Sequence, residues 1–170
     1  MNAGLLIVFS GLPGTGKTTL ARGLAEVMAA VYLRIDGIED GMRNSALRLG
    51  DVMDAGYRAI WEVAADNLEL GHTVIGDSVN PVQATRAGWR NVAHRTGARL
   101  REVAVICSDP AIHAARIAKR RARGIGPTWQ QVSARHYEAR ATPRLMVDTA
   151  LEGIDAALAR LAIELGPDSG

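Results

Sequence analysis

The stretch Gly11-Leu12-Pro13-Gly14-Thr15-Gly16-Lys17-Thr18 decides the fold class, because it matches the pattern G-x-x-x-x-G-K-[ST] in full. The apolar run Leu5–Phe9 before it predicts a buried strand, and a helical pattern begins at Lys17. Glycines let consecutive backbone N–H groups converge on an anion, and a helix N-terminus adds the positive end of its dipole. We therefore expect a strand–loop–helix unit that binds a nucleoside triphosphate. The expected binding residues are Gly11, Pro13, Gly14, Thr15, Gly16, Lys17, Thr18 and Thr19.

Two side chains of this loop have distinct chemical roles. Lys17 supplies a point charge for the outer phosphates, and it is one of only two lysines in the chain. The hydroxyl of Thr18 is a ligand for Mg²⁺, so we expect ATP and Mg²⁺ as cofactors. The loop alone does not separate a kinase from an ATPase or a GTP-driven switch. The chain lacks the Asn-Lys-x-Asp pattern that reads guanine, which disfavours a GTPase.

The composition is that of one soluble globular domain. Of 170 residues, 48% are hydrophobic and 22% are charged. We expect a single domain over residues 1–165 and a flexible tail over 166–170. No apolar run approaches the roughly 20 residues that span a bilayer, and the N-terminus lacks a charged signal region. We therefore expect a cytoplasmic protein with no membrane partner. The lone cysteine, Cys107, is expected to be a buried structural thiol. A net charge of +2 disfavours a general polyanion-binding surface.

Short apolar runs alternate with longer helical patterns along the chain. This alternation is typical of parallel βαβ units, so we expect a three-layer α/β/α fold around a five-stranded parallel sheet. The Asn80-Pro81 and Asp109-Pro110 pairs each predict a helix N-cap followed by proline. The expected strands are Leu5–Phe9, Val31–Ile35, Thr73–Ile75, Leu100–Cys107 and Arg144–Val147. The expected helices lie at about Lys17–Ala30, Val52–Leu70, Pro81–Thr96, Pro110–Arg121, Thr128–Arg140 and Gly153–Leu165.

Two aspartates follow expected strands, at the sheet edge where ligands gather. Asp36 comes after the second strand, where its carboxylate is placed to accept the proton of a substrate hydroxyl. The alternative is a turn or cap residue, since Asp36-Gly37 is also a turn pair. Asp77 closes the third strand, and we expect it to orient the Mg²⁺ water shell or the acceptor. Glu39 and Asp40 are expected in the following turn, facing solvent.

A basic segment with two glycines predicts a mobile lid at about residues 120–128. It follows a helix that carries Arg116 and Lys119, and it contains Arg120, Arg121 and Arg123. Arginines on such a loop can close over a triphosphate and stabilise charge on the transferred phosphoryl group. The alternative is a solvated basic helix end, which the helix dipole also favours.

Further arginines are candidates for an acceptor site. Arg86 lies two turns into the helix after Asp77, within reach of an acceptor phosphate; the alternative is a solvated surface arginine. The region Gly37–Tyr57, with Arg43, Arg48 and Arg58 around it, is expected to shape the acceptor pocket. The four histidines lack ligand spacing, so no structural metal site is expected. The aromatic side chains Trp61, Trp89 and Tyr137 are expected to pack in the core or in a groove.

With these residues assembled, the chain resembles small P-loop kinases of the AAA_33 type, which include the zeta-toxins, chloramphenicol phosphotransferase and polynucleotide 5′-kinases. The resemblance runs from Leu5 to about Thr149 and implies an ATP-dependent phosphotransferase. It implies that Asp36 is the general base, that Asp77 belongs to the site and that Arg120 and Arg123 contact phosphates. One departure concerns the acceptor, because Glu39 stands where polynucleotide kinases place an arginine for a 3′-phosphate.

The resulting hypothesis is a kinase that transfers the γ-phosphoryl group of ATP to a hydroxyl of a small-molecule acceptor. The expected catalytic residues are Asp36, Lys17, Arg120 and Arg123. The expected substrate-binding residues are Asp36, Arg43, Asp77 and Arg86, with Thr18 and Asp77 on the Mg²⁺. A polynucleotide 5′-hydroxyl kinase and a nucleotide-dependent regulatory module are the alternatives, and nucleic acid is the less favoured partner. The sequence does not indicate an oligomeric state.

Overall fold

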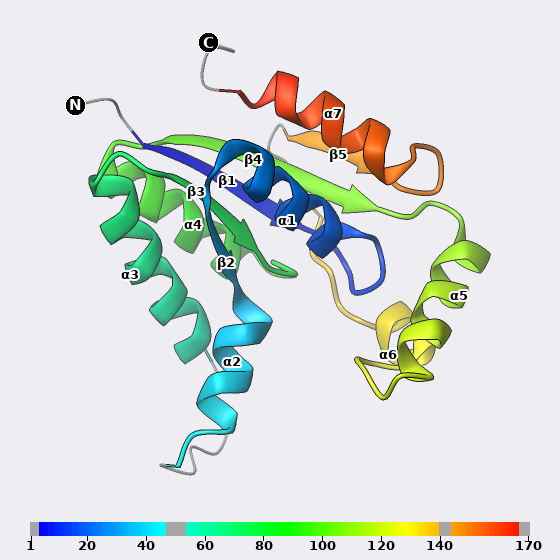
Figure 1. The fold of residues 1–170 in the computed structure, drawn as a ribbon. Helices are drawn as coiled ribbons and strands as arrows, with labels where there is room; N and C mark the ends of the chain where they lie inside the picture. The colour runs from blue at the N-terminus through cyan, green and yellow to red at the C-terminus, as the bar shows by residue number, and fades with distance from the viewer. Residues whose placement is uncertain (1–3, 47–53, 140–143, 167–170) are drawn as a thin grey trace.

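The protein folds into a parallel sheet between two layers of helices. The structure, a computed structural model, describes residues 4–46, 54–139 and 144–166. Five parallel strands lie in the order β2-β3-β1-β4-β5, which confirms the expected three-layer α/β/α class (Figure 1). The strands are β1 (Leu5–Ser10), β2 (Val31–Arg34), β3 (Thr73–Asp77), β4 (Arg99–Ile106) and β5 (Leu145–Asp148). The helices are α1 (Lys17–Met28), α2 (Ile35–Arg43), α3 (Ala55–Glu69), α4 (Gln83–Thr96), α5 (Pro110–Arg121), α6 (Trp129–Ser133) and α7 (Ile154–Glu164).

The central strand β1 sends alternate side chains into two separate hydrophobic clusters, as the strand period requires. Ile7 and Phe9 pack with α1 and α7, whereas Leu6 and Val8 pack with α3 and α4. Every residue of β1 is buried. The continuous apolar run therefore marks a strand that is covered on both faces.

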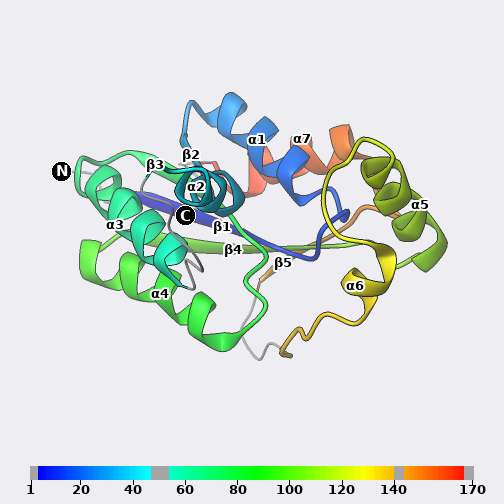
Figure 2. The ribbon, with the colours of Figure 1, turned by 90° about the horizontal axis from the view of Figure 1, so that it is seen from below.

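Three helices leave these layers and gather beyond the carboxyl ends of the strands. Helix α2 continues directly from β2, while α5 and α6 follow β4 and project past the end of the sheet (Figures 1 and 2). Ligands in open parallel sheets bind at this edge. No helix in the described ranges is long and apolar enough to cross a membrane.

Two expected elements differ from the structure. Helix α2 was not predicted, because Ile35 extends the apolar run of β2 and Gly37 is typical of a turn. Ile35 instead begins the helix and is buried against the α3 side of the sheet. Helix α6 is much shorter than the expected Thr128–Arg140. It begins with a capping box between Thr128 and Gln131 and ends at Ser133. The tail at 167–170 and the side chain of Arg48 lie outside the described residues.

Asn80 does not cap a helix, as the Asn80-Pro81 pair predicted. Its backbone is left-handed, with φ of 49°, and α4 begins at Gln83. The buried side-chain amide donates to the Ser10 hydroxyl at 3.0 Å and accepts from the indole N–H of Trp89 at 3.2 Å. Asn80 therefore joins the loop after β3 to β1. The Asp109 N-cap is confirmed, since its carboxylate accepts from the backbone N–H groups of Ala111 and Ile112.

Trp89 fills the core beneath β3, which confirms that it is a packing residue. Its side chain is fully buried, and Gly76 provides the space for it. A Cβ added at Gly76 would lie 2.7 Å from the Trp89 ring. Cys107 differs from expectation, because β4 ends at Ile106 and the thiol is only half-buried.

Candidate functional site

The glycine-rich loop between β1 and α1 has the backbone shape that an anion site needs. Gly14 and Gly16 have φ of 83° and 93°, in the left-handed region that favours glycine. Gly16 is also the N-cap of α1 and has no side chain to occupy the first N–H groups of the helix. Those N–H groups and the helix dipole therefore point at a ligand beyond the loop.

Lys17 and Asp77 form a buried ion pair beneath this loop. Both side chains are almost fully buried, and the Lys17 ammonium contacts Asp77 Oδ1. The Tyr32 hydroxyl donates to Asp77 Oδ2 at 2.8 Å, so a partner holds each carboxylate oxygen. Burial, together with the Asp77 charge, raises the pKa of Tyr32 above its ordinary range. The pair is thus neutralised within the core, as buried charges require.

Tyr32 was not among the site residues predicted from the sequence. The alternation of side chains along β2 could have indicated it, because Val31 and Leu33 pack on the α3 side of the sheet. Tyr32 must then face the α1 side, where Lys17 begins its helix, and it packs there. The pairing of Arg34 with Asp77 in the β2–β3 register places both strand ends at the same edge.

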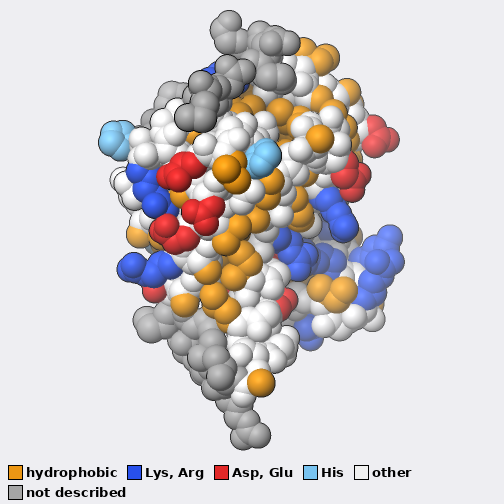
Figure 3. All heavy atoms as spheres, turned by 60° about the vertical axis from the view of Figure 1, so that its left-hand side comes forward, with side chains coloured by type: hydrophobic (Ala, Val, Ile, Leu, Met, Phe, Trp, Pro, Cys, Tyr) orange, Lys and Arg blue, Asp and Glu red, His pale blue; other side chains and the backbone are white. Residues whose placement is uncertain are grey.

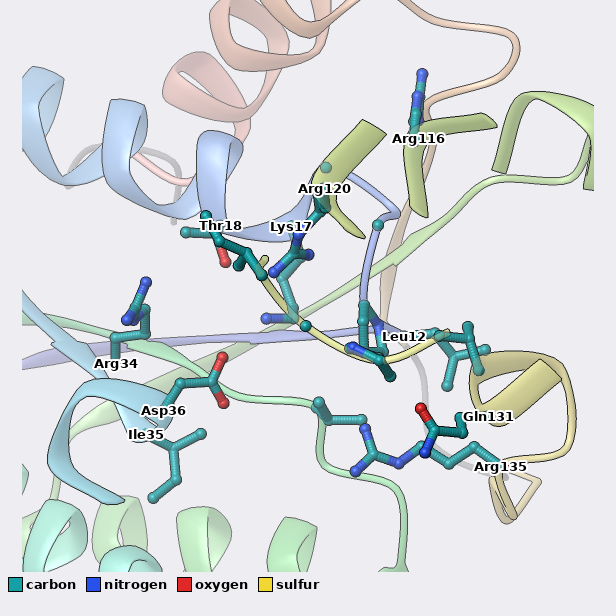
Figure 4. A pocket seen from close by; sticks show the side chains of 18 of the residues that line it. Leu12, Lys17, Thr18, Arg34, Ile35, Asp36, Arg116, Arg120, Gln131 and Arg135 are labelled. Atoms are coloured by element: carbon teal, nitrogen blue, oxygen red, sulfur yellow. The ribbon is translucent and has the colours of Figure 1, made fainter. Parts of the chain in front are cut away.

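Asp36 lies in the first turn of α2, with an exposed side chain. It is neither in a turn nor an N-cap, because Arg34 is the cap of α2. Figure 4 shows the carboxylate pointing into an open space between α2 and the loop before α1. The Thr18 hydroxyl faces the same space. The strand end and the loop therefore bring Asp36 and Thr18 together, as the sequence predicted.

This space is a cavity of about 1080 Å³ at the carboxyl edge of the sheet. Its volume is at the upper end of the roughly 300–1,000 Å³ of ordinary ligand pockets. Its walls come from the loop, from α2, from the segment after β3 and from α5 and α6. Of the predicted site residues, the lining includes Pro13, Gly14, Gly16, Lys17, Thr18, Thr19, Asp36, Arg43, Arg120 and Arg123.

Glu39 does not face solvent in a turn, as was expected. It lies in α2, lines the cavity, and has a side chain only 20% exposed. Arg43 donates to it at 2.9 Å and to Asp40 at 3.3 Å. The negative charge of Glu39 is therefore compensated within its own helix. Burial, above all, raises the pKa of the neighbouring Tyr57 to about 12, so this hydroxyl stays protonated in the cavity wall.

The basic segment lies over the phosphate side of the cavity. Lys119, Arg120 and Arg123 all line it, whereas Arg121 donates to the Gly126 carbonyl at 3.1 Å and does not. Arg120 and Arg123 are exposed, as residues of a lid would be. The lid itself stays a prediction, because one structure shows no movement.

The first two turns of α5, up to Arg116, are fixed to the phosphate-binding loop by contacts that no sequence pattern indicated. Arg116 donates to the Thr149 hydroxyl at 2.6 Å, and that hydroxyl donates to the Thr15 carbonyl at 2.7 Å. His113 Nε2 lies 2.7 Å from the Pro13 carbonyl oxygen. The His113–Pro13 and Thr149–Thr15 contacts join residues 100 and 134 positions apart, and Arg116 and Thr149 are 33 apart, so no local pattern indicates these contacts.

Arg86 has a different role from either of those expected for it. It is buried rather than solvated, and it does not line the cavity. Its guanidinium donates to the main-chain carbonyls of Asn80, Pro81, Glu138 and Ala139 at 2.7–3.2 Å. It also lies 5.2 Å from the centre of the Tyr137 ring. Arg86 therefore joins the start of α4 to the segment after α6. Four of its five N–H groups are used there, and its side chain lies outside the cavity lining, so it does not face an acceptor phosphate in the cavity.

The side chains present suit Mg²⁺ better than a metal held by soft ligands. Mg²⁺ takes one or two protein oxygens and completes its shell with phosphates and water. The Thr18 hydroxyl and the Asp36 carboxylate offer such oxygens in one cavity. Among the residues that the structure describes, no group of three His, Cys, Asp or Glu side chains gathers in the way a structural metal centre needs.

Solved structures of kinases share this fold. A putative kinase from Chloroflexus aurantiacus superposes with a TM-score of 0.79 over 97% of both chains, at 23% identity. The Mycobacterium tuberculosis APS kinase CysC, in complex with AMPPNP and APS, gives 0.72 over 97% of this chain and 98% of that one, at 24% identity. A gluconokinase from Sinorhizobium meliloti gives 0.64 over the full length of both, at 20% identity.

Sequence relatives match only part of the chain. An adenylyl-sulfate kinase of Chloroflexus aurantiacus is 31% identical over 90 residues, which is 50% of this chain and 48% of that protein. An uncharacterised Mycobacterium tuberculosis protein is 33% identical over 103 residues, or 54% of this chain and 21% of that protein. The aligned part therefore spans about a fifth to a half of these curated relatives. The family model described as an AAA domain matches residues 6–141, and by this match the chain belongs to the AAA_33 family of P-loop proteins.

Proposed function

We propose that this protein is a kinase that transfers the γ-phosphoryl group of ATP, with Mg²⁺, to a hydroxyl of a small-molecule acceptor. The observation that carries the proposal is the composition of one cavity. It contains a glycine-rich anion loop, a set of basic side chains and an exposed carboxylate. A binding module without transfer needs only the first of these. The kinases among the structural neighbours support the same reaction class.

In the proposed reaction, Asp36 accepts the proton of the acceptor hydroxyl as the oxygen attacks the γ-phosphorus. A bond forms between that oxygen and phosphorus, and the bond from phosphorus to the β–γ bridging oxygen breaks, so that ADP leaves. Lys17, the loop N–H groups, Arg120 and Arg123 stabilise the negative charge on the phosphoryl oxygens. When bound, Mg²⁺ would supply further charge neutralisation, held by the Thr18 hydroxyl near Asp36; Asp77 is fully buried outside the cavity lining and would act on the phosphates only through Lys17.

The Lys17–Asp77 pair has a further role in this scheme. A phosphate in the loop offers the Lys17 ammonium a second anionic partner beside Asp77 Oδ1. Tyr32 holds the other carboxylate oxygen, so Asp77 keeps its orientation whichever partner Lys17 takes. We expect Tyr32 to position Asp77 without touching a substrate.

The test is radiolabelled γ-phosphate transfer from ATP, with Mg²⁺, to a panel of acceptors. The panel holds free sugars, nucleosides, nucleoside monophosphates, nucleotide sugars, hydroxylated antibiotics and 5′-hydroxyl oligonucleotides. We expect label on a small molecule, and we expect Asp36→Asn to lose transfer by at least about 100-fold while ATP affinity is retained. Asp66→Asn removes an exposed carboxylate of α3 outside the cavity and is the matched control.

Other outcomes would favour the alternatives. Label on the oligonucleotide alone, with an acceptor affinity that falls steeply as salt is added, would favour a polynucleotide kinase. Tight ATP binding with only slow release of free phosphate would favour a regulatory module. Full transfer by Asp36→Asn would exclude Asp36 as the general base.

A further inference from the structure

We propose that the acceptor carries an anionic group beside its reacting hydroxyl, and that Arg135, with Arg34, binds that group. The shared chemistry is a planar or tetrahedral oxyanion: a carboxylate, a phosphate ester or a sulfate ester. The identification of this ligand as the acceptor rests on the proposed kinase function. The anion site itself rests on the charges of the cavity.

The cavity is far more basic than the chain as a whole. Basic side chains in its lining outnumber acidic ones by eight to three, although the whole chain has a net charge of only +2. On the face drawn in Figure 3, Lys and Arg side chains gather at the lower right, apart from most of the acidic ones. The excess positive charge is therefore concentrated at the site.

Part of this charge is already matched by other groups. Lys17 is paired with Asp77, and Arg43 with Glu39 and Asp40. The basic residues of α5 and the turn after it lie on the phosphate side, where a nucleotide would neutralise them. Two arginines in the lining remain without an assigned anion, and they are Arg34 and Arg135.

Arg135 lies on the side of the cavity opposite α2. It follows α6, and Figure 4 shows its side chain extending from there along the cavity toward the side where Asp36 lies. The guanidinium is exposed and has no ion pair within ranges 4–46, 54–139 and 144–166. Gln131, one turn earlier, lines the same wall and offers an amide.

Arg34 flanks Asp36 from the other side. It is the last residue of β2, two positions before Asp36, and its side chain lies near Gly37. Figure 4 shows Arg34 and Asp36 side by side at one end of the cavity. A molecule that places its hydroxyl at Asp36 therefore meets a guanidinium at each end.

The chemistry of arginine favours an oxyanion over a neutral group. The planar guanidinium donates two parallel hydrogen bonds to a carboxylate, phosphate or sulfate, and it keeps its charge at all relevant pH values. The acidic residue that argued against an anionic acceptor, Glu39, is neutralised by Arg43 at 2.9 Å. The pairing with Arg43 therefore reduces the repulsion that Glu39 exerts on an anion beside Asp36.

The first experiment tests the anion site without any transfer. The protein is saturated with AMPPNP and Mg²⁺ so that the phosphate loop is filled, and inorganic sulfate is then titrated by calorimetry. We expect one sulfate site, weakened about 10-fold or more in Arg135→Gln, since hydrogen bonds to charged groups contribute about that factor. The sulfate affinity of Arg135→Lys should be intermediate, because lysine keeps the positive charge but cannot donate two parallel hydrogen bonds to one oxyanion.

The control for this titration is Arg58→Gln. Arg58 is an exposed arginine of α3 that pairs with Asp54 and does not line the cavity, so its loss removes the same charge elsewhere. Sulfate that binds equally to the Arg135→Gln and Arg58→Gln proteins would overturn the proposal. So would the absence of sulfate binding to the native protein, or an Arg135→Gln protein whose AMPPNP affinity falls by as much as its sulfate affinity.

The second experiment uses paired acceptors in which one member carries an oxyanion and the other does not. The pairs are glucose and gluconate, a nucleoside and its 5′-monophosphate, and a sugar alcohol and its sulfate ester. We expect the anionic member of at least one pair to have a kcat/KM at least tenfold higher, and Arg135→Gln to raise its KM without raising the KM for ATP. The preferred pair identifies the oxyanion. Equal use of both members in every pair would overturn the proposal.

The two proposals fail in different ways. If no acceptor is labelled while AMPPNP still binds, the kinase function is contradicted, and the sulfate titration still decides the anion site. If a neutral acceptor is labelled efficiently and Asp36→Asn abolishes the labelling, the kinase function stands and the anion site is wrong.

Discussion

The phosphate-binding half of the cavity and the acceptor half hold their charges in opposite ways. Lys17 and Asp77 are buried, and each is neutralised by a partner inside the fold. Asp36 and Arg135 are exposed on elements beyond the sheet. Buried charges are costly unless they are paired, whereas exposed ones contribute little to stability. Substitutions in the phosphate-binding half should therefore destabilise the fold, whereas substitutions in the acceptor half should change substrate binding with little effect on stability.

Asp77→Asn should give the largest effect, because it leaves the buried Lys17 ammonium without its anion. We expect a loss of about 3–5 kcal/mol in the free energy of unfolding, measured by urea denaturation. Asp36→Asn, the exposed counterpart, should change that free energy by less than about 0.5 kcal/mol. Equal losses in the two variants would contradict the contrast between the halves.

Arg86→Met should come next. The substitution keeps much of the side-chain volume but removes hydrogen bonds to four main-chain carbonyls around α4 and the segment after α6. We expect about 2–3 kcal/mol of destabilisation, with little change in ATP affinity. Arg95→Met, which removes one exposed ion pair with Glu62, is the control and should cost less than about 0.5 kcal/mol. An unaltered stability with a raised acceptor KM would restore the phosphate-binding role for Arg86.

Tyr32→Phe should have a smaller effect, because it removes one hydrogen bond and leaves the ion pair intact. We expect a loss of about 1 kcal/mol in unfolding free energy. If Tyr32 positions Asp77, kcat should fall several-fold while the KM for ATP changes little. A variant with normal kcat would limit Tyr32 to a structural role.

Arg123→Gln should have the smallest effect on stability and still impair transfer. Its side chain is exposed, so we expect a change within about 0.5 kcal/mol. Loss of a charge that stabilises the transferred phosphoryl group should lower kcat about tenfold or more. Arg121→Gln is matched in charge and location, but Arg121 bonds the Gly126 carbonyl and does not line the cavity. Similar kcat values for the two variants would argue against a specific role for Arg123.

The features that sequence analysis predicted are those that a local pattern determines. The glycine-rich loop, its strand and its helix are contiguous, and a carboxylate at the end of a parallel strand must lie at the ligand edge. That reasoning placed Asp36 in the cavity. It also predicted that Asp77 binds Mg²⁺ or the acceptor, whereas the structure buries Asp77 outside the cavity lining and pairs it with Lys17 and Tyr32. The five-stranded parallel sheet followed from the alternation of apolar runs with helical patterns.

The features that it missed depend on residues far apart in the chain. The partners of Arg86 include carbonyls at Glu138 and Ala139, so an apparently solvated arginine of α4 became a buried one. Asn80 looked like a cap because proline follows it, but its amide is used by β1 and Trp89. Helix α2 was missed because Ile35 belongs equally well to a strand pattern.

The hydrogen bonds from Arg116 through the Thr149 hydroxyl to Thr15 limit how α5 can move. They act as a pivot, because the middle of the helix, at Arg116, is tied both to the phosphate loop and to Thr149 just after β5. His113, in contact with the Pro13 carbonyl, adds a second tie one turn earlier. Any closure must then be a movement of the segment beyond Arg116, toward Gly124 and Gly126, relative to this fixed part of the helix. A nucleotide that shifts the phosphate-binding loop would therefore also shift α5. Nucleotide binding would in this way change the positions of Arg120 and Arg123 beyond the fixed part of the helix.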